Sequence, residues 1–160
     1  MFDTIDDLNN QGLRKRALGE VDVFQFDATH ELYAHMNINY VKLDRLPPFE
    51  RWGDALAPLA RGDFFTTTGE VLLPDVKLSA DGDRLSAIAR VRWTFPLKFA
   101  EVVWGDGRET HRQMIELTHT REFGEATFHW HATAPGWKWA RLAVWDVAGN
   151  GAFVNPIWGR

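Results

Sequence analysis

The stretch RLSAIARVRWTF, residues 84–95, decides the fold class. Its side chains fall into two alternating sets: one apolar, Ala87, Ala89, Val91, Trp93 and Phe95, and one mixed, Ile88, Arg90, Arg92 and Thr94. A period of two residues is typical of a β-strand with one face in a core and the other in solvent. The stretch therefore predicts a half-buried strand, and a sheet around it.

Further segments of strand length lie on both sides of this stretch. They are FFTTTGEVLL (64–73), KFAEVVW (98–104), HRQMIELTH (111–119), EATFHWHAT (125–133), KWARLAVWDV (138–147) and AFVNPIW (152–158). Asp106–Gly107 and Asn150–Gly151 are hairpin signals, and Pro74 is expected to end the strand before it. Residues 63–160 are therefore predicted to form an Ig-like antiparallel β-sandwich of about seven strands, in a mainly β protein.

The first 62 residues have a different pattern and are predicted to form a small, mixed α/β arm. Residues 1–20 show a weak helical pattern that ends at Gly19, EVDVFQF and INYVKL each suggest a strand, and residues 28–36 suggest a helical turn. LPPFERWGDALAPLARGD, residues 46–63, is the clearest helix. Its apolar stripe consists of Phe49, Trp52, Leu56 and Leu59. Pro58 lacks the N–H group that a helix interior needs, so a break or kink is expected near Ala57.

Composition excludes several classes of function. The 160 residues carry a net charge of -4 with a pI near 5.8, so no excess of cations is available to neutralise the phosphates of nucleic acid. No apolar run approaches the roughly 18 residues of a membrane span, and the polar N-terminus does not resemble a signal peptide. The absence of cysteine excludes disulfides and thiolate chemistry, but it leaves the compartment open.

Two clusters contain residues that bind metal ions in other proteins. Asp27, His30 and His35 combine a carboxylate with two imidazoles, a set that can bind a divalent ion and activate water, although such polar residues are also common in loops. His129 and His131 share one face of a predicted strand. The alternative for this second pair is that Phe128 and Trp130 face the core while both histidines face solvent. The sequence contains no complete catalytic set; its only serines are Ser79 and Ser86, which are expected in a turn.

The last long strand has an unusual outer face. Ala140, Leu142 and Val144 make its inner face, whereas Trp139, Arg141 and Trp145 lie on the face that a sandwich normally gives to solvent. Exposed indoles would favour aggregation, so either the N-terminal segment or another subunit is expected to cover this interface. A different possibility is a carbohydrate-binding platform made of Trp137, Trp139 and Trp145.

Two stretches together resemble the C-terminal region of PHP-type (polymerase and histidinol phosphatase superfamily) metal-dependent hydrolases. RWGDALAPLARGDFFTTTGEVLLPD resembles the segment that follows the catalytic barrel, with a G-x-F-x-T-x-G pattern at Gly62, Phe64, Thr66 or Thr67, and Gly69. RLAVWDVAGNGAFVNPIW resembles the closing strands, with matching positions at Arg141, Asp146, Gly149, Asn155, Pro156, Ile157 and Trp158. The resemblance covers roughly residues 36–160.

The resemblance implies the end of a barrel-like region (residues 1–62) followed by the sandwich (residues 63–160), without most of the catalytic barrel. The early H-x-H metal motif of such barrels has no counterpart here, and the family's late Asp and His ligands correspond roughly to Asp27 and His30. The chain is therefore expected to be a non-catalytic accessory domain that packs on or completes such a hydrolase, its partner being a catalytic barrel or further copies of itself. The alternatives are a carbohydrate-binding sandwich and a partial metal-dependent hydrolase that uses Asp27, His30 and His35.

Overall fold

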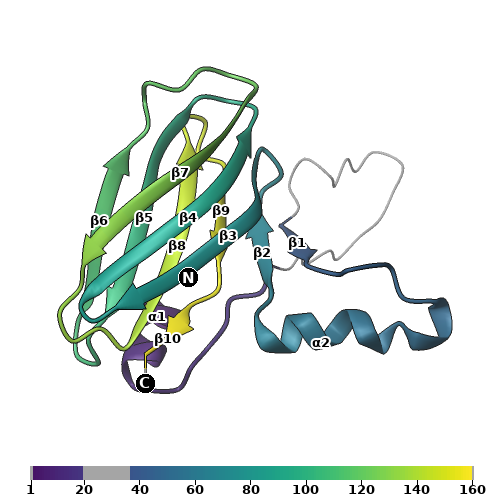
Figure 1. Cartoon of the computed structure of the whole chain (residues 1–160), viewed down its shortest axis with the longest axis horizontal. Coiled ribbons are helices and arrows are strands. Elements are labelled where there is room, and N and C mark those ends of the chain that lie inside the picture. Colours follow the sequence, from purple (N-terminus) through teal and green to yellow (C-terminus); the bar gives the residue numbers. More distant parts are fainter. Residues whose placement is uncertain (1, 20–36, 160) are drawn as a thin grey trace.

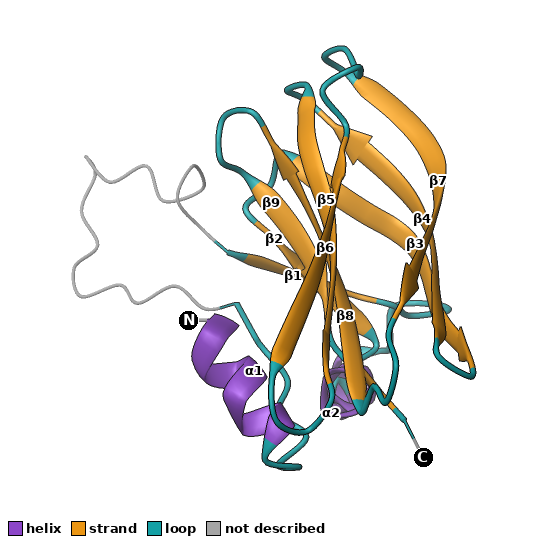
Figure 2. Cartoon of the chain, turned by 90° about the vertical axis from the view of Figure 1, so that its left-hand side faces the viewer, coloured by secondary structure: helices purple, strands orange, loops and turns teal. Residues whose placement is uncertain are grey.

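The protein is a mainly β structure in which two antiparallel sheets pack face to face (Figure 1, Figure 2). The computed structural model describes residues 2–19 and 37–159. In spatial order, sheet A contains β1 (Ile38–Val41), β2 (Phe64–Thr67), β9 (Gly151–Val154), β8 (Trp139–Asp146), β5 (Leu97–Gly105) and β6 (Thr110–Glu116), and β10 (Ile157–Trp158) also pairs with β8. Sheet B contains β3 (Val71–Asp81), β4 (Arg84–Trp93) and β7 (Gly124–Thr133). The predicted β-sandwich fold is thereby confirmed.

The core lies between the two sheets, where the alternating apolar positions of each strand meet. From sheet B the core receives Ala87, Ala89, Val91 and Trp93, as the alternation predicts, and from sheet A it receives Ala140, Leu142 and Val144. Phe95 does not follow the pattern: it is 42% exposed because β4 ends at Trp93. Burial of these apolar side chains is the main favourable contribution to folding.

Two hairpin turns close as predicted. Asp106 starts the turn between β5 and β6, and Asp146 starts the turn between β8 and β9, where its carboxylate accepts hydrogen bonds from the backbone N–H groups of Ala148 and Asn150. Gly149 has a positive φ of 87°. Gly151 does not; its place requires glycine because a Cβ atom would collide with the Trp145 ring.

The structure differs from the sequence prediction at Pro74 and in the number of strands. Pro74 does not end a strand; β3 is an edge strand, and a register shift between Leu72 and Asp75 accommodates the missing N–H group. Residues 64–73, predicted as one strand, instead contain β2 and the start of β3, which are separated by a turn at Gly69. The segment at residues 152–158 likewise splits around Pro156, where β9 (Gly151–Val154) ends and β10 begins. The described residues 63–159 therefore contain nine strands, where about seven were predicted.

The described part of the arm contributes both to the sandwich and to a projecting element. Helix α1 (Phe2–Asn10) packs on the outer side of sheet A, and β1 pairs with β2 (Figure 2). The 3₁₀ helix η1 (Phe49–Arg51) and helix α2 (Gly53–Arg61) instead lie beside the β1–β2 edge of the sandwich (Figure 1). β1, which precedes the predicted boundary between residues 62 and 63, belongs to the same sheet as the later strands, and the boundary itself stays a prediction. The strand predicted at residues 20–26 and the helical turn at 28–36 lie outside the described residues.

The first helix is shorter than predicted. α1 ends at Asn10, and the chain turns at Gly12, which has a φ of 80°. The residues beyond it follow the sheet: the backbone N–H of Ala17 donates to Asn155, and Gly19 exchanges two hydrogen bonds with Asn39. Asn155 and Asn39 therefore bind the backbone at Ala17 and Gly19, and residues 13–19 do not continue the helix.

Candidate functional site

Helix α2 is continuous where a break was predicted. Pro58 lies inside it and is buried, whereas the interruption falls at Trp52, between η1 and α2. The helix ends as predicted at Gly62, which adopts the left-handed conformation (φ 85°) and donates its N–H to the carbonyls of Leu59 and Pro58. Pro58 is the sixth of the nine residues of α2, so its missing N–H group removes one hydrogen bond, to the carbonyl of Asp54 in the first turn, and only three helical residues follow it.

The apolar side of this arm faces away from the sandwich. One side of α2, formed by Asp54, Ala57, Pro58 and Arg61, lines a cleft against the sheets. The predicted apolar stripe runs along the opposite side: Phe49 lies in η1, Trp52 immediately precedes α2, and Leu56 and Leu59 lie in α2. All of these side chains are exposed except that of Leu59, which is half-buried. Four apolar side chains of the arm are exposed: Leu46 (87%), Phe49 (91%), Trp52 (61%) and Leu56 (46%). We call these four residues the outer apolar face of the arm. Helices of globular proteins normally turn such a stripe inward, so α2 has the reverse orientation.

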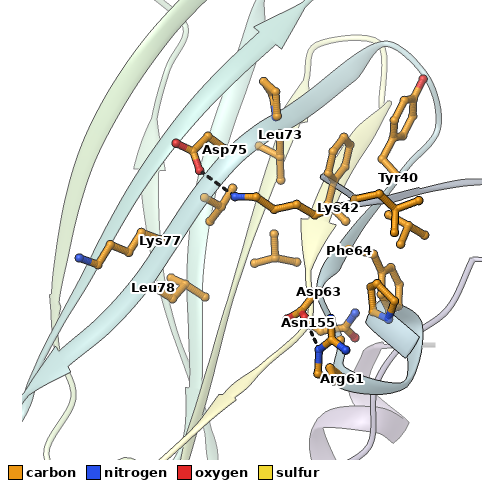
Figure 3. Close-up of a pocket in the computed structure, with 18 of the residues that line it drawn as sticks. Tyr40, Lys42, Arg61, Asp63, Phe64, Leu73, Asp75, Lys77, Leu78 and Asn155 are labelled. Carbon is orange, nitrogen blue, oxygen red and sulfur yellow. Dashed lines mark hydrogen bonds and ion pairs between the residues drawn. The ribbon is translucent and has the colours of Figure 1, made fainter. Parts of the chain in front are cut away.

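The cleft between α2 and the sandwich is open and has a volume of about 960 Å³ (Figure 3). Its lining includes Leu73 and Leu78 of β3 and Phe64 of β2, with charged side chains around them. Two ion pairs lie at its rim: Lys42 to Asp75 (3.9 Å) and Arg61 to Asp63 (2.7 Å). All four partners are largely solvated, so these pairs contribute little stability.

The charges of the cleft balance. Four basic residues line it, Lys42, Arg61, Lys77 and Arg92, together with four acidic residues, Asp44, Asp54, Asp63 and Asp75. A cleft with equal numbers of both signs, several of them already paired, has no net attraction for an anion or a cation.

The outer face of sheet A is covered by the chain's own N-terminal helix. Trp139 is fully buried and its indole N–H donates to Asn10 (2.9 Å), while Arg141 is 2% exposed. The Arg141 guanidinium donates two hydrogen bonds to the carboxylate of Asp6, at 3.0 and 2.8 Å, and lies 4.4 Å from the centre of the Phe2 ring. The N-terminal segment therefore covers this face, which was one of the two possibilities that the sequence left open.

The polar network beneath α1 extends across the neighbouring strands. Glu101 of β5 lies 3.9 Å from the Arg141 guanidinium, forms an ion pair with Arg112 of β6 (3.1 Å) and accepts a hydrogen bond from the Trp145 indole (3.2 Å). Asp6 and Glu101 therefore balance Arg141 and Arg112. Pairing of this kind is required when charges are removed from water.

Sequence reasoning missed Asp6, Asn10 and Glu101. The signal that could have found the first two is their spacing: Phe2, Asp6 and Asn10 recur every four residues and so lie on one side of a helix. Asp6 and Asn10 are polar, whereas the packing face of a helix is usually recognised from apolar residues at this spacing. Glu101 lies on a strand whose neighbours are almost all apolar, which marks it as a buried acid in need of a cation.

The predicted metal-ligand clusters are not assembled by the described part of the chain. Asp27, His30 and His35 lie outside the described residues. His129 and His131 are exposed on the outer face of β7, and Trp130 between them faces the core. In residues 2–19 and 37–159 there is no group of three or more His, Cys, Asp or Glu side chains placed to hold a metal ion.

The structure brings His131 close to a serine. The Oγ atom of Ser86 lies 3.0 Å from Nδ1 of His131, across the β4–β7 pair. Ser79 faces Ser86 in the β3–β4 pair, so both serines are strand residues and not turn residues as expected. The contact lies on the exposed outer face of sheet B and is a cross-strand side-chain pair.

The three tryptophans of the predicted carbohydrate platform do not form one exposed row. Trp139 is buried under α1, and the Trp145 indole is engaged by Glu101. Trp137 donates to the carbonyl of Gly82 at the end of the sandwich. Sugar stacking needs flat, accessible rings, and Trp139 does not offer one.

One carboxylate has a strongly perturbed pKa. The pKa of Asp106 is held well below its usual range, first by the backbone N–H of Glu109, then by the His111 side chain and the backbone N–H of Arg108. The donors lie 2.8 Å (Glu109), 3.1 Å (His111) and 2.8 Å (Arg108) from the carboxylate. These contacts close the β5–β6 turn, so the perturbation is structural in origin.

Comparison with known proteins gave no relative of the chain: no family model, no curated protein and no solved structure matches it. No helix in the described ranges is long and apolar enough to cross a membrane.

Proposed function

We propose that this chain is a non-catalytic accessory β-sandwich domain that packs on the catalytic barrel of a PHP-type metal-dependent hydrolase. The observation that carries the proposal is the reversed orientation of α2, which presents the outer apolar face of the arm to solvent. The resemblance to the segment that follows such a barrel supports the identity of the partner. The outer apolar face lies within the part of the chain that has this resemblance.

The energetic argument rests on the size of the exposed side chains. Aromatic side chains bury about 150–250 Å² each, so Phe49 and Trp52, with 91% and 61% of their surface exposed, present roughly 300 Å². At about 25 cal/mol per Å² their burial contributes roughly 7–8 kcal/mol. This gain offsets only the lower part of the roughly 4–15 kcal/mol that association costs, so burial of Leu46 and Leu56 is needed as well. Exposed aromatic residues that cluster in this way are typical of the centre of a protein interface.

The polar surroundings also suit an interface. Arg51, which precedes Trp52 in the chain, forms an exposed ion pair with Asp54. Solvated polar residues around an apolar centre are the usual arrangement at a rim that remains wet after association.

Binding to purified barrels tests the proposal. Each PHP-type barrel protein encoded in the source genome is titrated with the full chain by isothermal calorimetry, and hydrolysis is followed in parallel. We expect one-to-one binding to at least one barrel, and at least tenfold weaker binding of a Phe49→Asn, Trp52→Asn variant. The matched control is Phe123→Asn, because Phe123 is an equally prominent aromatic residue (82% exposed) on the sandwich, outside the arm.

Two results would contradict the proposal. The first is the absence of binding to every barrel in the set. The second is binding that the double variant and the Phe123→Asn control weaken equally, because the contact would then not depend on the outer apolar face.

A further inference from the structure

The contact between α1 and sheet A has the character of an interface between separate molecules. The hydrophobic core contains residues of both sheets and none of α1, so the sandwich is packed without the helix. α1 has only nine residues, and isolated helices shorter than about 12–15 residues are marginal in water. Its helical form therefore depends on docking.

Polar anchors dominate this contact. Phe2, Asp6 and Asn10 lie along one side of α1, and each meets a specific partner on the sheet. The Phe2 ring packs edge-on against Phe153 at 4.7 Å, Asp6 receives two hydrogen bonds from Arg141, and Asn10 binds both Trp139 and Thr110. A bidentate carboxylate–guanidinium pair selects geometry as well as charge. The sheet thus binds an aromatic residue, an aspartate and an asparagine that follow one another at four-residue intervals along the helix.

The contact is also incompletely satisfied. Among the described residues, Arg141 Nη1 is a buried donor at this contact without a hydrogen-bond partner, and it lies 3.9 Å from Glu101. Buried donors without partners weaken the association that buries them. Gly12, with a φ of 80°, and Arg14, with a φ of 44°, lie in the exposed loop that follows the helix, where rotation could release it.

We propose that the face of sheet A around Arg141 is a docking site for a short acidic helix, and that α1 occupies this site as an exchangeable ligand within the same chain. The occupant that the site accepts in trans is a helical peptide segment carrying an aromatic residue, an aspartate four residues later and an asparagine four residues after that. This site is separate from the outer apolar face of the arm, so it does not depend on the proposed accessory role.

A competition experiment on the full chain tests the inference. Asp6→Ala removes the carboxylate that α1 presents to Arg141, and a fluorescent peptide of residues 1–12 is then titrated by anisotropy. We expect saturable one-to-one binding, at least tenfold weaker binding of a peptide with Asp6→Asn, and unchanged binding of a peptide with Asp7→Asn, because Asp7 is exposed. The wild-type chain should bind the peptide far more weakly, since its own helix competes at high effective concentration.

Equal binding of the two altered peptides would overturn the inference, as would a cooperatively folded Asp6→Ala chain that binds no peptide. If Asp6→Ala does not fold, a protease site inserted after Gly12 of the otherwise unchanged chain replaces it. After cleavage, α1 should dissociate on dilution, and the wild-type peptide should rebind at least tenfold more tightly than the Asp6→Asn peptide. A helix that stays bound at nanomolar dilution, or equal rebinding of both peptides, would refute exchange.

Discussion

The buried pair of Asp6 and Arg141 should cost more to break than to replace. Both side chains are almost fully buried, at 1% and 2% exposure, and they share two hydrogen bonds. Removal of one partner from a buried ion pair typically costs about 3–5 kcal/mol, because the other charge is left without compensation. Replacement of both partners by apolar side chains of similar size is often neutral.

The structure sets an upper limit to the cost of each single change. α1 lies outside the core, so Arg141 or Asp6 can regain water if the helix detaches, and the loss cannot exceed the free energy of docking. We therefore expect Asp6→Leu and Arg141→Met each to lower the free energy of unfolding by about 3 kcal/mol, near the bottom of the usual range. Glu101 is not left unpaired by Arg141→Met, because Arg112 and the Trp145 indole still bind it.

The assay is a double-mutant cycle in urea, followed by tryptophan fluorescence. With a slope of about 2–3 kcal/mol per M, each single variant should unfold at roughly 1 M less urea. The double variant should be more stable than either single variant by about 2 kcal/mol, because replacement of both charges leaves neither one unpaired. Asp7→Leu, an exposed neighbour in the same helix, is the control and should change stability by less than about 0.5 kcal/mol. Additive losses in the double variant would refute the reasoning that the two charges balance each other.

Three further outcomes are expected. Phe49→Asn should change the free energy of unfolding by less than about 0.5 kcal/mol in urea titrations, because the side chain is 91% exposed. A larger loss would mean that the Phe49 side chain packs on the folded protein. The pKa of Asp106 measured by NMR should lie below its ordinary value of 3.8, so its stabilising effect is complete above that pH and is lost as the pH falls through the lower folded-state pKa; a normal pKa would contradict the turn geometry. Gly105→Ala should displace the end of α1, because its Cβ atom would collide with the Trp139 indole and Asn10; faster hydrogen exchange of the α1 amides measures this, and unchanged exchange would contradict it.

The sandwich could be predicted because its signals are local. Alternation in residues 84–93 reports which side of a pleated strand meets the core, and the structure confirms both faces. The same alternation separates Trp130, which faces the core, from His129 and His131, which face solvent. The hairpin turns after β5 and β8 also follow from adjacent residues, since a turn needs only one short side chain and one permissive backbone position.

The candidate surfaces could not be predicted in the same way. An apolar stripe at helical spacing indicates amphipathicity, but it does not say whether the stripe faces its own sandwich. The chain enters β2 directly after Gly62, and this connection places the side of α2 that carries Asp54 and Pro58 against the sheets. Phe49 and Trp52 are exposed because they lie on the opposite side of the arm. The direction in which a helix faces is a consequence of its connections.

The sequence by itself determined the β-rich class, the inner faces of the strands and the need for a cover on the last long strand, because side-chain alternation and turn chemistry act over a few residues. Only the tertiary structure decided what the cover is. Asp6 and Arg141 are 135 positions apart in the sequence, and no local pattern around either residue indicates that the two form an ion pair. Their pairing arises because docking α1 removes both charges from water, and a buried charge requires an opposite one within hydrogen-bonding distance.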